Sequence, residues 1–487
     1  MNKRGFTLVE LIGTIVILLV LSLLVFPNLL NLIKNSKKDI STSTKDFIYG
    51  QAKSYIYDNV NGYTLKEGNI YCIGLKDLVS KNYLNTPLKD AESGNDIDLS
   101  KQIEVKVNNN DYSYELVETC TPKSYYTDNS GANTPKLFNN MVPIKYENNK
   151  WLVADLYSKW YDYDAKQWAN AVVLNSGVTK NVGDEVTEEE ISLWYVWVPR
   201  YKYTIFNGNN GSATAQLINV TFENEVDKTG TVTCKDNTDG SETCTDNTYG
   251  SILNGTSTYT HPAFKFGSTN LTGFWVGKFE VSGSTSAITV KPNVTSLRNQ
   301  TLSSFFTAIQ NVKTKYEISN ADSHMLKNME WGAVAYLKQS KYGLGTTDIA
   351  VNTSSSYYTG GGTDNAYKTN VAQSTTGNIY GIYDMSGGAD EYVMSNYNDT
   401  IINAGFSSMP AAKYYDKCTS STGKTGDATT ETSGWYSDFA AFPLSGYPWL
   451  TRGGSYAYGI NVGVFYFINS NGGGDRSVSA RAVLTAQ

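Results

Sequence analysis

A long apolar run near the N-terminus is the strongest constraint on how this chain of 487 residues can fold. Phe6 to Phe26 would form about 30 Å of helix at ~1.5 Å per residue, enough to cross the apolar core of a bilayer. Lys3 and Arg4 precede the run, and one carboxylate, Glu10, lies inside it. Because cations before a membrane span hold its N-terminus in the cytoplasm, the sequence predicts a single-pass membrane protein with a cytoplasmic N-terminus and an extracellular bulk.

The segment around Gly5, KRGFTLVELIG, resembles the class III signal and N-terminal helix of type IV pilins and pseudopilins, a likeness that covers residues 3–50. The resemblance implies that prepilin peptidase cleaves after Gly5 and that Phe6 becomes the N-methylated first residue. It also implies that Glu10 pairs with the methylated amine of a neighbouring pilus or pseudopilus subunit. A secretory signal peptide or a plain membrane anchor is the alternative, although no small-residue cleavage site comes after the run.

Shifts in composition divide the chain. Apolar side chains recur every three or four positions up to Tyr57, which is typical of an amphipathic helix. Two prolines and a run of polar residues then indicate a linker before the tryptophan-rich part, where buried aromatic area is expected. The predicted segments are a leader peptide (1–5), an N-terminal helix (6–57, membrane-spanning over 6–26), a small pilin-like head (58–121), a linker (122–135) and a large domain (136–487).

The composition favours an extracellular, β-rich protein. Tyr is abundant at 36 residues, Gly reaches 42, and charged residues make up only 18%. The net charge of −6 excludes a typical nucleic-acid binder. We therefore expect an α+β fold, with a long N-terminal α-helix and a small β head followed by a large β-rich domain. Residues 346–376 are polar and Gly-rich, which predicts a long surface loop.

Two pairs of cysteines are candidates for disulfides in an exported chain. Cys72 and Cys120 lie in the small head, and Cys234 and Cys244 flank an Asp-Gly turn signal that would form a hairpin. Free thiols are the alternative for each pair. The fifth cysteine, Cys418, has no evident partner.

Five phrases of the C-terminal half resemble, in order and spacing, the formylglycine-generating-enzyme variety of the C-type lectin fold. They are GFWVGKFEVSG (273–283), HMLKNMEWGAVAYL (324–337), NIYGIYDMSGGADEYV (378–393), RGGSY (452–456) and RSVSARAVL (476–484). The resemblance implies a lectin-like domain, for which an unrelated Trp- and Tyr-rich β-domain is the alternative.

The chemistry of the formylglycine class is not expected here. Those enzymes bind copper through C-terminal cysteines, and no cysteine comes after Cys418. Related iron enzymes use a set of histidines, and only His261 and His324 exist in this chain. No catalytic residue, redox cofactor or metal site is therefore predicted, and the chain is expected not to be an enzyme. An exported enzyme of this type stays a disfavoured alternative.

In the family the SGGADEY phrase often holds a structural Ca²⁺. This chain departs from the pattern, with Gly388 in place of Asn and Asp390 in place of Trp. Glu391 with Asp384 or Asp390 could still offer oxygen ligands for Ca²⁺, but a solvated acidic turn is the favoured interpretation.

The C-terminal segment 452–484 resembles the variable terminus of proteins that are diversified by retroelements. Tyr offers rigid contact area and Ser, Asn and Gly offer adaptable polar contacts, as in a paratope. An ordinary Tyr- and Asn-rich loop is the alternative. The expected ligand-binding residues are Tyr458, Ile460, Asn461, Tyr466, Ile468, Asn469, Ser470, Asn471, Asp475 and Arg476; the wider variable set adds Ala457, Ser477 and Val478.

These patterns together predict a minor-pilin-like protein of the cell surface or pilus. It would be anchored by its N-terminal helix and would display a lectin-like domain that binds a protein or glycan for adhesion or recognition. A pseudopilin of a secretion or DNA-uptake machine is the alternative, although the appendage after residue 136 is large for such a subunit.

Overall fold

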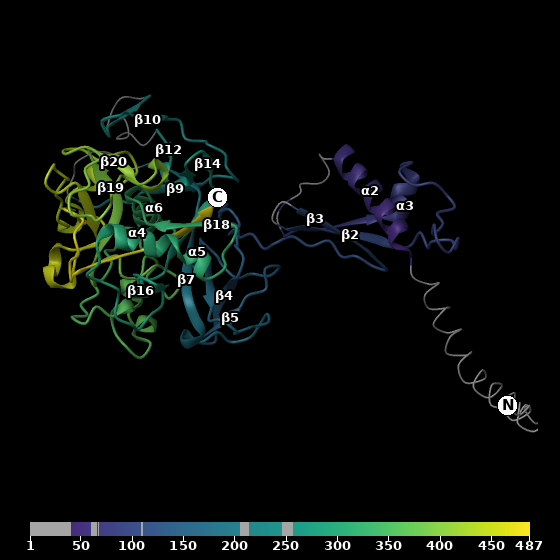
Figure 1. Cartoon of the computed structure of the whole chain (residues 1–487), viewed down its shortest axis with the longest axis horizontal. Helices are drawn as coiled ribbons and strands as arrows, with labels where there is room; N and C mark the ends of the chain where they lie inside the picture. Colours follow the sequence, from purple (N-terminus) through teal and green to yellow (C-terminus); the bar gives the residue numbers. More distant parts are fainter. Residues whose placement is uncertain (1–39, 60–65, 67, 109–110, 205–213, 246–256) are drawn as a thin grey trace, which may run out of the picture. The chain divides into compact units, whose positions relative to one another are not determined.

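The computed structural model divides the chain into two compact units, Met1–Tyr125 and Tyr126–Gln487 (Figure 1). The residues it describes are 40–59, 66, 68–108, 111–204, 214–245 and 257–487. The predicted cleavage site at Gly5 and Phe6, Glu10 and the predicted span 6–26 lie outside these residues. No helix of the described part is long and apolar enough to cross a membrane.

The described part of unit 1 consists of helix α2, a small sheet and the short helix α3. Helix α2 (Thr42–Asp58) precedes a three-stranded antiparallel sheet with the order β1-β2-β3, made of β1 (Ile70–Gly74), β2 (Gln102–Asn108) and β3 (Asp111–Val117). The short helix α3 (Leu75–Ser80) comes directly after β1. In β2 the buried residues Ile103, Val105 and Val107 alternate with polar ones, as expected of a strand with one buried face.

The core of unit 1 follows from the helical period. Ile48, Ala52 and Ile56 are four residues apart and share one face of α2, where all three are buried. They join Ile103 and Val105 of β2 in one hydrophobic cluster.

A disulfide between Cys72 and Cys120 holds β1 to the segment after β3, with 5.6 Å between the two Cα atoms. A small apolar core and one disulfide thus stabilise unit 1.

Unit 2 is built on a seven-stranded antiparallel sheet with the order β18-β24-β15-β7-β6-β4-β5. The central strand β7 is buried at every position, which explains why its sequence ISLWYVWVP is apolar almost throughout. The strands are β4 (Met141–Glu147), β5 (Lys150–Val153), β6 (Asn170–Leu174), β7 (Ile191–Pro199), β15 (Gly273–Gly277), β18 (Ala321–Met325) and β24 (Ala482–Ala486).

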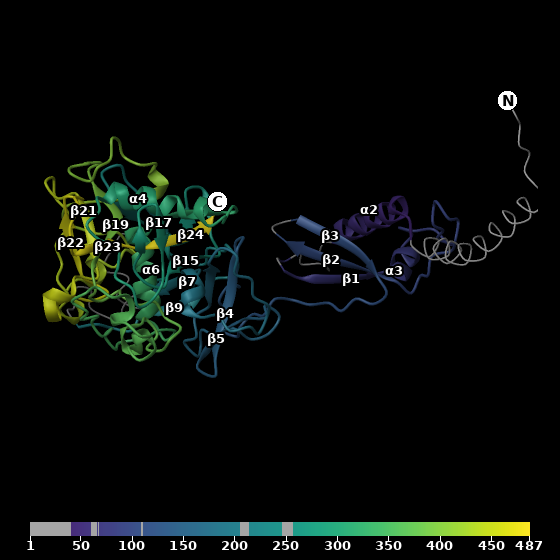
Figure 2. The same ribbon diagram turned by 60° about the horizontal axis from the view of Figure 1, so that its bottom comes forward.

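A second sheet of five strands includes three strands from the C-terminal part of the chain, β21, β22 and β23. Its order is β20-β19-β21-β22, and β23 pairs in parallel with β19. Figure 2 shows β19, β21, β22 and β23 side by side. The strands are β19 (Asp390–Tyr397), β20 (Asp416–Cys418), β21 (Trp449–Arg452), β22 (Phe467–Ser470) and β23 (Val478–Ala480).

Smaller sheets complete unit 2. One has three strands in the order β12-β8-β9, with β8 (Tyr201–Thr204), β9 (Asn219–Phe222) and β12 (Tyr259–Thr260). The other three are two-stranded: β10 (Cys234–Asp236) pairs with β11 (Glu242–Cys244), β13 (Lys265–Phe266) with β14 (Thr269–Asn270), and β16 (Ser282–Ser284) with β17 (Ala287–Thr289).

Three helices pack on these sheets. Helix α6 (Asn328–Lys338) contacts β7 of the larger sheet and β19 of the smaller one, and all its residues are buried (Figures 1 and 2). Helices α4 (Leu302–Gln310) and α5 (Val312–Lys315) pack against β18. The core of unit 2 therefore has helix α6 between two sheets, in an α+β arrangement.

Two polar segments pack more closely than their composition suggests. Residues 126–135, expected to be linker, bond to unit 2: the Tyr126 N–H donates to the Leu156 carbonyl at 2.7 Å, and Asp128 accepts from the Tyr163 N–H at 2.6 Å. The surface loop predicted over 346–376 is wrong in part, because Tyr367 is fully buried in the core.

Candidate recognition surface

A buried arginine supports the C-terminal segment from below. Arg452, at the end of β21, donates from Nη1 to Asn328 Oδ1 at 2.9 Å and from Nη2 to the Ala428 carbonyl at 2.8 Å. Its guanidinium lies over the rings of Trp331 and Phe467. Burial lowers the pKa of Arg452 to about 10, which leaves the side chain charged at neutral pH.

The turn after Arg452 needs glycine. Gly453 and Gly454 have φ of +83° and +72°, which an L side chain rarely adopts. A Cβ on Gly454 would lie 2.5 Å from Val462 Cγ1. Trp331 fixes the next segment by donating from Nε1 to the Val464 carbonyl at 2.7 Å. The RGGSY phrase is thus a rigid support for residues 456–461.

An apolar tip projects from this support. The 3₁₀ helix η11 (Tyr456–Asn461) carries Tyr458, which is 47% exposed, and Ile460, which is 85% exposed. Phe439, from another segment, is 48% exposed. We call Phe439, Tyr458 and Ile460 the apolar tip. Exposed apolar groups gathered on a rigid support are typical of an interaction surface.

Tyr466 differs from the expectation of a ligand contact, because it is only 2% exposed. Its ring stacks on Tyr458 with 6.2 Å between centroids and lies 6.2 Å from the ring of Phe439. Tyr466 therefore joins two members of the apolar tip from beneath.

The other predicted contacts fall into two groups. Asn461, Asp475 and Arg476 are exposed. Ile468, Asn469, Ser470 and Asn471, on and after β22, are half-buried. Some polar groups of the segment are already engaged: Asn469 Nδ2 donates to the Phe442 carbonyl at 2.8 Å, Ser470 Oγ lies 3.2 Å from the Tyr392 hydroxyl, and Asp475 Oδ1 accepts from the Ser477 N–H at 2.7 Å.

No sequence pattern indicated the roles of two further residues of this region. Phe439 lies in a segment without any motif, so nothing predicted its place beside Tyr458. Asp390 was considered only as a calcium ligand, yet an ionised Asp390 carboxylate would raise the pKa of both Tyr458 and Tyr466. It is buried, its Oδ1 has no hydrogen-bond partner among the described residues, and burial raises its pKa well above the usual range.

The solvated acidic turn predicted at SGGADEY is wrong, because Asp384, Asp390 and Glu391 are all buried. Glu391 forms a two-pronged ion pair with Arg481, whose Nε lies 2.9 Å from Oε2. Asp384 accepts from Asn352 Nδ2 and from the Gly360 N–H, both at 2.9 Å. Protein donors therefore occupy oxygens that a Ca²⁺ ion would need.

The cysteines and histidines lie in different surroundings in the described part of the chain. The structure joins Cys234 to Cys244 across the β10–β11 hairpin, and Cys418 is free and buried. Burial lowers the pKa of His261 to about 3 and keeps it neutral. His324 lies between two carboxylates in the core. The carboxylate of Glu242 lies near the sulfurs of Cys234 and Cys244, but the disulfide leaves no thiolate to bind a metal there.

A known family matches the N-terminal segment of the chain. Residues 1–26 match the family described as the prokaryotic N-terminal methylation motif. This motif implies processing by prepilin peptidase and a membrane-anchored, exported, pilin-like protein. The rest of the chain has a mixed α+β fold that is rich in β structure.

Two solved structures are among those that match this chain. The Major Tropism Determinant I1 variant is 12% identical, with 80% of this chain and 82% of that chain covered and a TM-score of 0.28. The Major Tropism Determinant U1 variant is 11% identical, with the same coverage and TM-score. No curated protein matches the chain. The fold of this chain is therefore described by its sheet topology and not by these two matches.

Proposed function

We propose that this chain is a minor-pilin-like protein of the cell surface or pilus that displays a lectin-like ligand-binding domain for adhesion or recognition. Its N-terminal helix would insert in the membrane or among pilus subunits, where Glu10 would pair with the methylated amine of a neighbouring Phe6. Unit 2 would bind a protein or glycan through residues 452–484. The role is binding and not catalysis.

The N-terminal part of the proposal is supported by the methylation motif over residues 1–26. It is also supported by unit 1, in which α2 packs on a three-stranded sheet to form a small head. A substitution of Gly5 should leave residues 1–5 attached in cells that contain prepilin peptidase.

The lectin-like part is supported by where its sequence phrases lie. GFWVG forms the buried strand β15, MEWGAVAYL lies in helix α6, and the final AVL of the last phrase lies in β24 beside β15. RGGSY begins at the end of β21 and forms the glycine turn beneath η11. Each of these four phrases thus contributes an element or a turn to unit 2.

The apolar tip is the single observation that carries the binding proposal. Phe439 and Tyr458 are linked through the buried Tyr466, while Arg452 and Trp331 fix the backbone beneath them. A rigid support lowers the entropy that is lost when a ligand binds, and exposed aromatic groups supply contact area.

The test is a binding screen with the full chain in non-ionic detergent against arrays of immobilised glycans and cell-surface proteins. The variant F439S/Y458S/I460S should lose at least about tenfold in affinity for whatever the wild type binds, as expected for central apolar contacts. The control V182S/L217S/I402S removes three other exposed apolar side chains of unit 2. Equal binding by the tip variant, or an equal loss in the control, would contradict the proposal.

We further propose that the terminus is diversified by a retroelement. Exposed Tyr458, Ile460 and Asn461 sit on a support of glycines and buried side chains that can tolerate changes at the surface. The check is genomic: a reverse transcriptase gene nearby, with a near-copy of this 3′ segment that differs only at adenines. Without both, the diversification proposal fails while ligand binding can still stand.

A further inference from the structure

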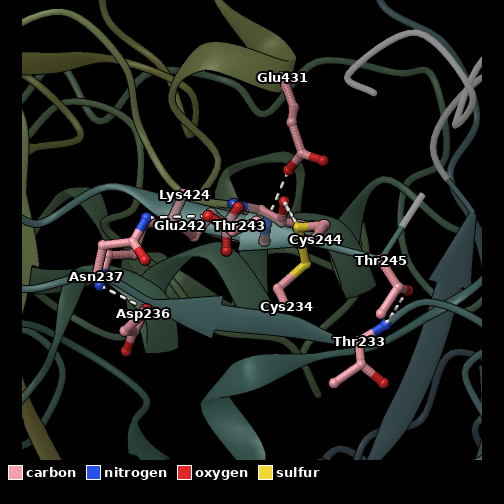
Figure 3. The surroundings of a disulfide bond; sticks show 12 residues. Thr233, Cys234, Asp236, Asn237, Glu242, Thr243, Cys244, Thr245, Lys424 and Glu431 are labelled. Atoms are coloured by element: carbon pink, nitrogen blue, oxygen red, sulfur yellow. Dashed lines mark hydrogen bonds and ion pairs between the residues drawn. A yellow bond between two sulfur atoms is a disulfide. The ribbon is translucent and has the colours of Figure 1, made fainter. Parts of the chain in front are cut away.

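Unit 2 contains a cavity of about 810 Å³ that is separate from the residues of the apolar tip. The β10–β11 hairpin, the turn that starts at His261, and segments around Lys413 and Lys424 line it. Figure 3 shows the disulfide of this hairpin with Glu242 and Lys424 close by. The volume falls in the usual range for small-molecule sites, about 300–1,000 Å³.

Positive charge is concentrated at this cavity although the chain as a whole is acidic, with a net charge of −6. Three carboxylates line it: Asp236, Glu242 and Asp416. The cationic lining residues are more numerous: Arg200, Lys228, Lys235, Lys265, Lys327, Lys413, Lys417 and Lys424.

Some of these cations are already paired. Lys424 lies 2.8 Å from Asp236, and Lys327 lies 3.6 Å from Asp416. Lys413 and Lys417 pair with carboxylates outside the lining. These pairs neutralise part of the charge and hold the wall in place.

Four of the cationic lining residues have N–H groups without a partner among the described residues. Lys228, Lys235 and Lys265 are exposed and make no ion pair within the described ranges. Arg200 is almost fully buried; its Nε lies 3.0 Å from Glu223, but its Nη2 has no hydrogen-bond partner among the described residues. An unpaired buried guanidinium N–H costs free energy unless a further acceptor reaches it.

The wall of the cavity is formed before any ligand arrives. The Cys234–Cys244 disulfide closes the β10–β11 hairpin. The Thr425 N–H donates to Glu242 Oε1 and ties that hairpin to the wall segment around Lys424. A preformed site loses little entropy on binding.

We propose that this cavity binds a small polyanion, a molecule that carries two or more carboxylate, sulfate or phosphate groups. Lys228, Lys235 and Lys265 attract it by charge, while Arg200, held by Glu223, forms part of the inner wall. The exposed Thr233 hydroxyl supplies a further donor. This site is independent of the recognition role proposed for residues 452–484.

The experiment is calorimetric titration of the full chain in non-ionic detergent at low and high NaCl with three probes. Trigalacturonate carries carboxylates on a saccharide, tripolyphosphate carries phosphates, and maltotriose is neutral. Binding of either anion supports the site and distinguishes the two sources of charge. We expect the affinity to fall as NaCl is raised, since exposed charges are screened by salt.

The variants assign the binding to the cavity. K228Q/K235Q/K265Q should weaken binding by roughly tenfold, whereas the arginine version K228R/K235R/K265R should retain it. The control K53Q/K76Q/K81Q removes the same charge from exposed lysines of unit 1. No anion binding by the wild type, equal binding of maltotriose, or equal losses in the glutamine variant and the control would each overturn the proposal.

Discussion

A buried carboxyl group of unit 2 predicts how the stability of this unit depends on pH. Glu431, in the 3₁₀ helix η9 (Thr430–Thr432), is buried against Tyr336, whose hydroxyl donates to Oε2 at 2.5 Å. The Gly426 N–H donates to the same oxygen at 2.8 Å. Burial, which disfavours the charged form, raises the pKa of Glu431 from 4.5 to about 8.

The sign of the effect follows from proton binding. Between pH 4.5 and 8 the folded chain keeps a proton on Glu431 that the unfolded chain has lost. The free energy of unfolding therefore falls as the pH rises through this window. At pH 7 the loss relative to pH 4.5 is about 3 kcal/mol, at ~1.4 kcal/mol per pKa unit.

The variant Glu431→Gln cannot titrate, so it should lack this part of the pH dependence. Relative to the wild type, it should gain about 3 kcal/mol between pH 4.5 and pH 7. The pKa values of Asp438 and Glu391 are also raised, to about 7 each, but both groups remain in the variant and cancel in the difference.

Urea unfolding followed by tryptophan fluorescence measures this difference in the full chain. All nine tryptophans lie between Trp151 and Trp449, so the signal reports unit 2 alone. Glu317→Gln, at an exposed carboxylate, is the control and should show no such gain. A difference between Glu431→Gln and wild type that stays constant from pH 4.5 to 7 would refute the reasoning.

Three further predictions concern stability. C72S/C120S should cost unit 1 about 4 kcal/mol, because the disulfide closes a loop with a sequence separation of 48; hydrogen exchange in β2 and β3 should speed up while the tryptophan signal stays unchanged. Gly453→Ala should lower the free energy of unfolding of unit 2 by about 1–2 kcal/mol, because Gly453 has a positive φ; the urea midpoint should fall accordingly. Arg481→Met should cost about 3–5 kcal/mol by leaving Glu391 unpaired, and R481M/E391M should recover part of that loss in the same urea assay.

Local patterns were enough to predict several elements. The Asp-Gly signal between Cys234 and Cys244 predicted a hairpin, which the chain forms as β10–β11. The RGGSY phrase lies at the end of a strand, where its glycines turn the chain. In each case neighbouring residues alone decide the backbone path.

The errors arose where distant residues decide burial. Glu391 is buried because Arg481, 90 residues away, pairs with it. Tyr367 sits in a polar, Gly-rich segment, yet its hydroxyl donates to Glu188 at 2.6 Å and its ring packs on Trp194. Tyr466 lies beneath Tyr458 because β22 pairs with β21. None of these partners can be read from local periodicity.

The most direct test of the account is the N-terminal mass of the chain recovered from cells that contain prepilin peptidase. The account predicts a mature chain that begins with N-methylated Phe6, and an uncleaved chain when Gly5 is substituted. A wild-type chain that keeps residues 1–5, or one cleaved beyond Phe26 like a secretory signal peptide, would contradict it.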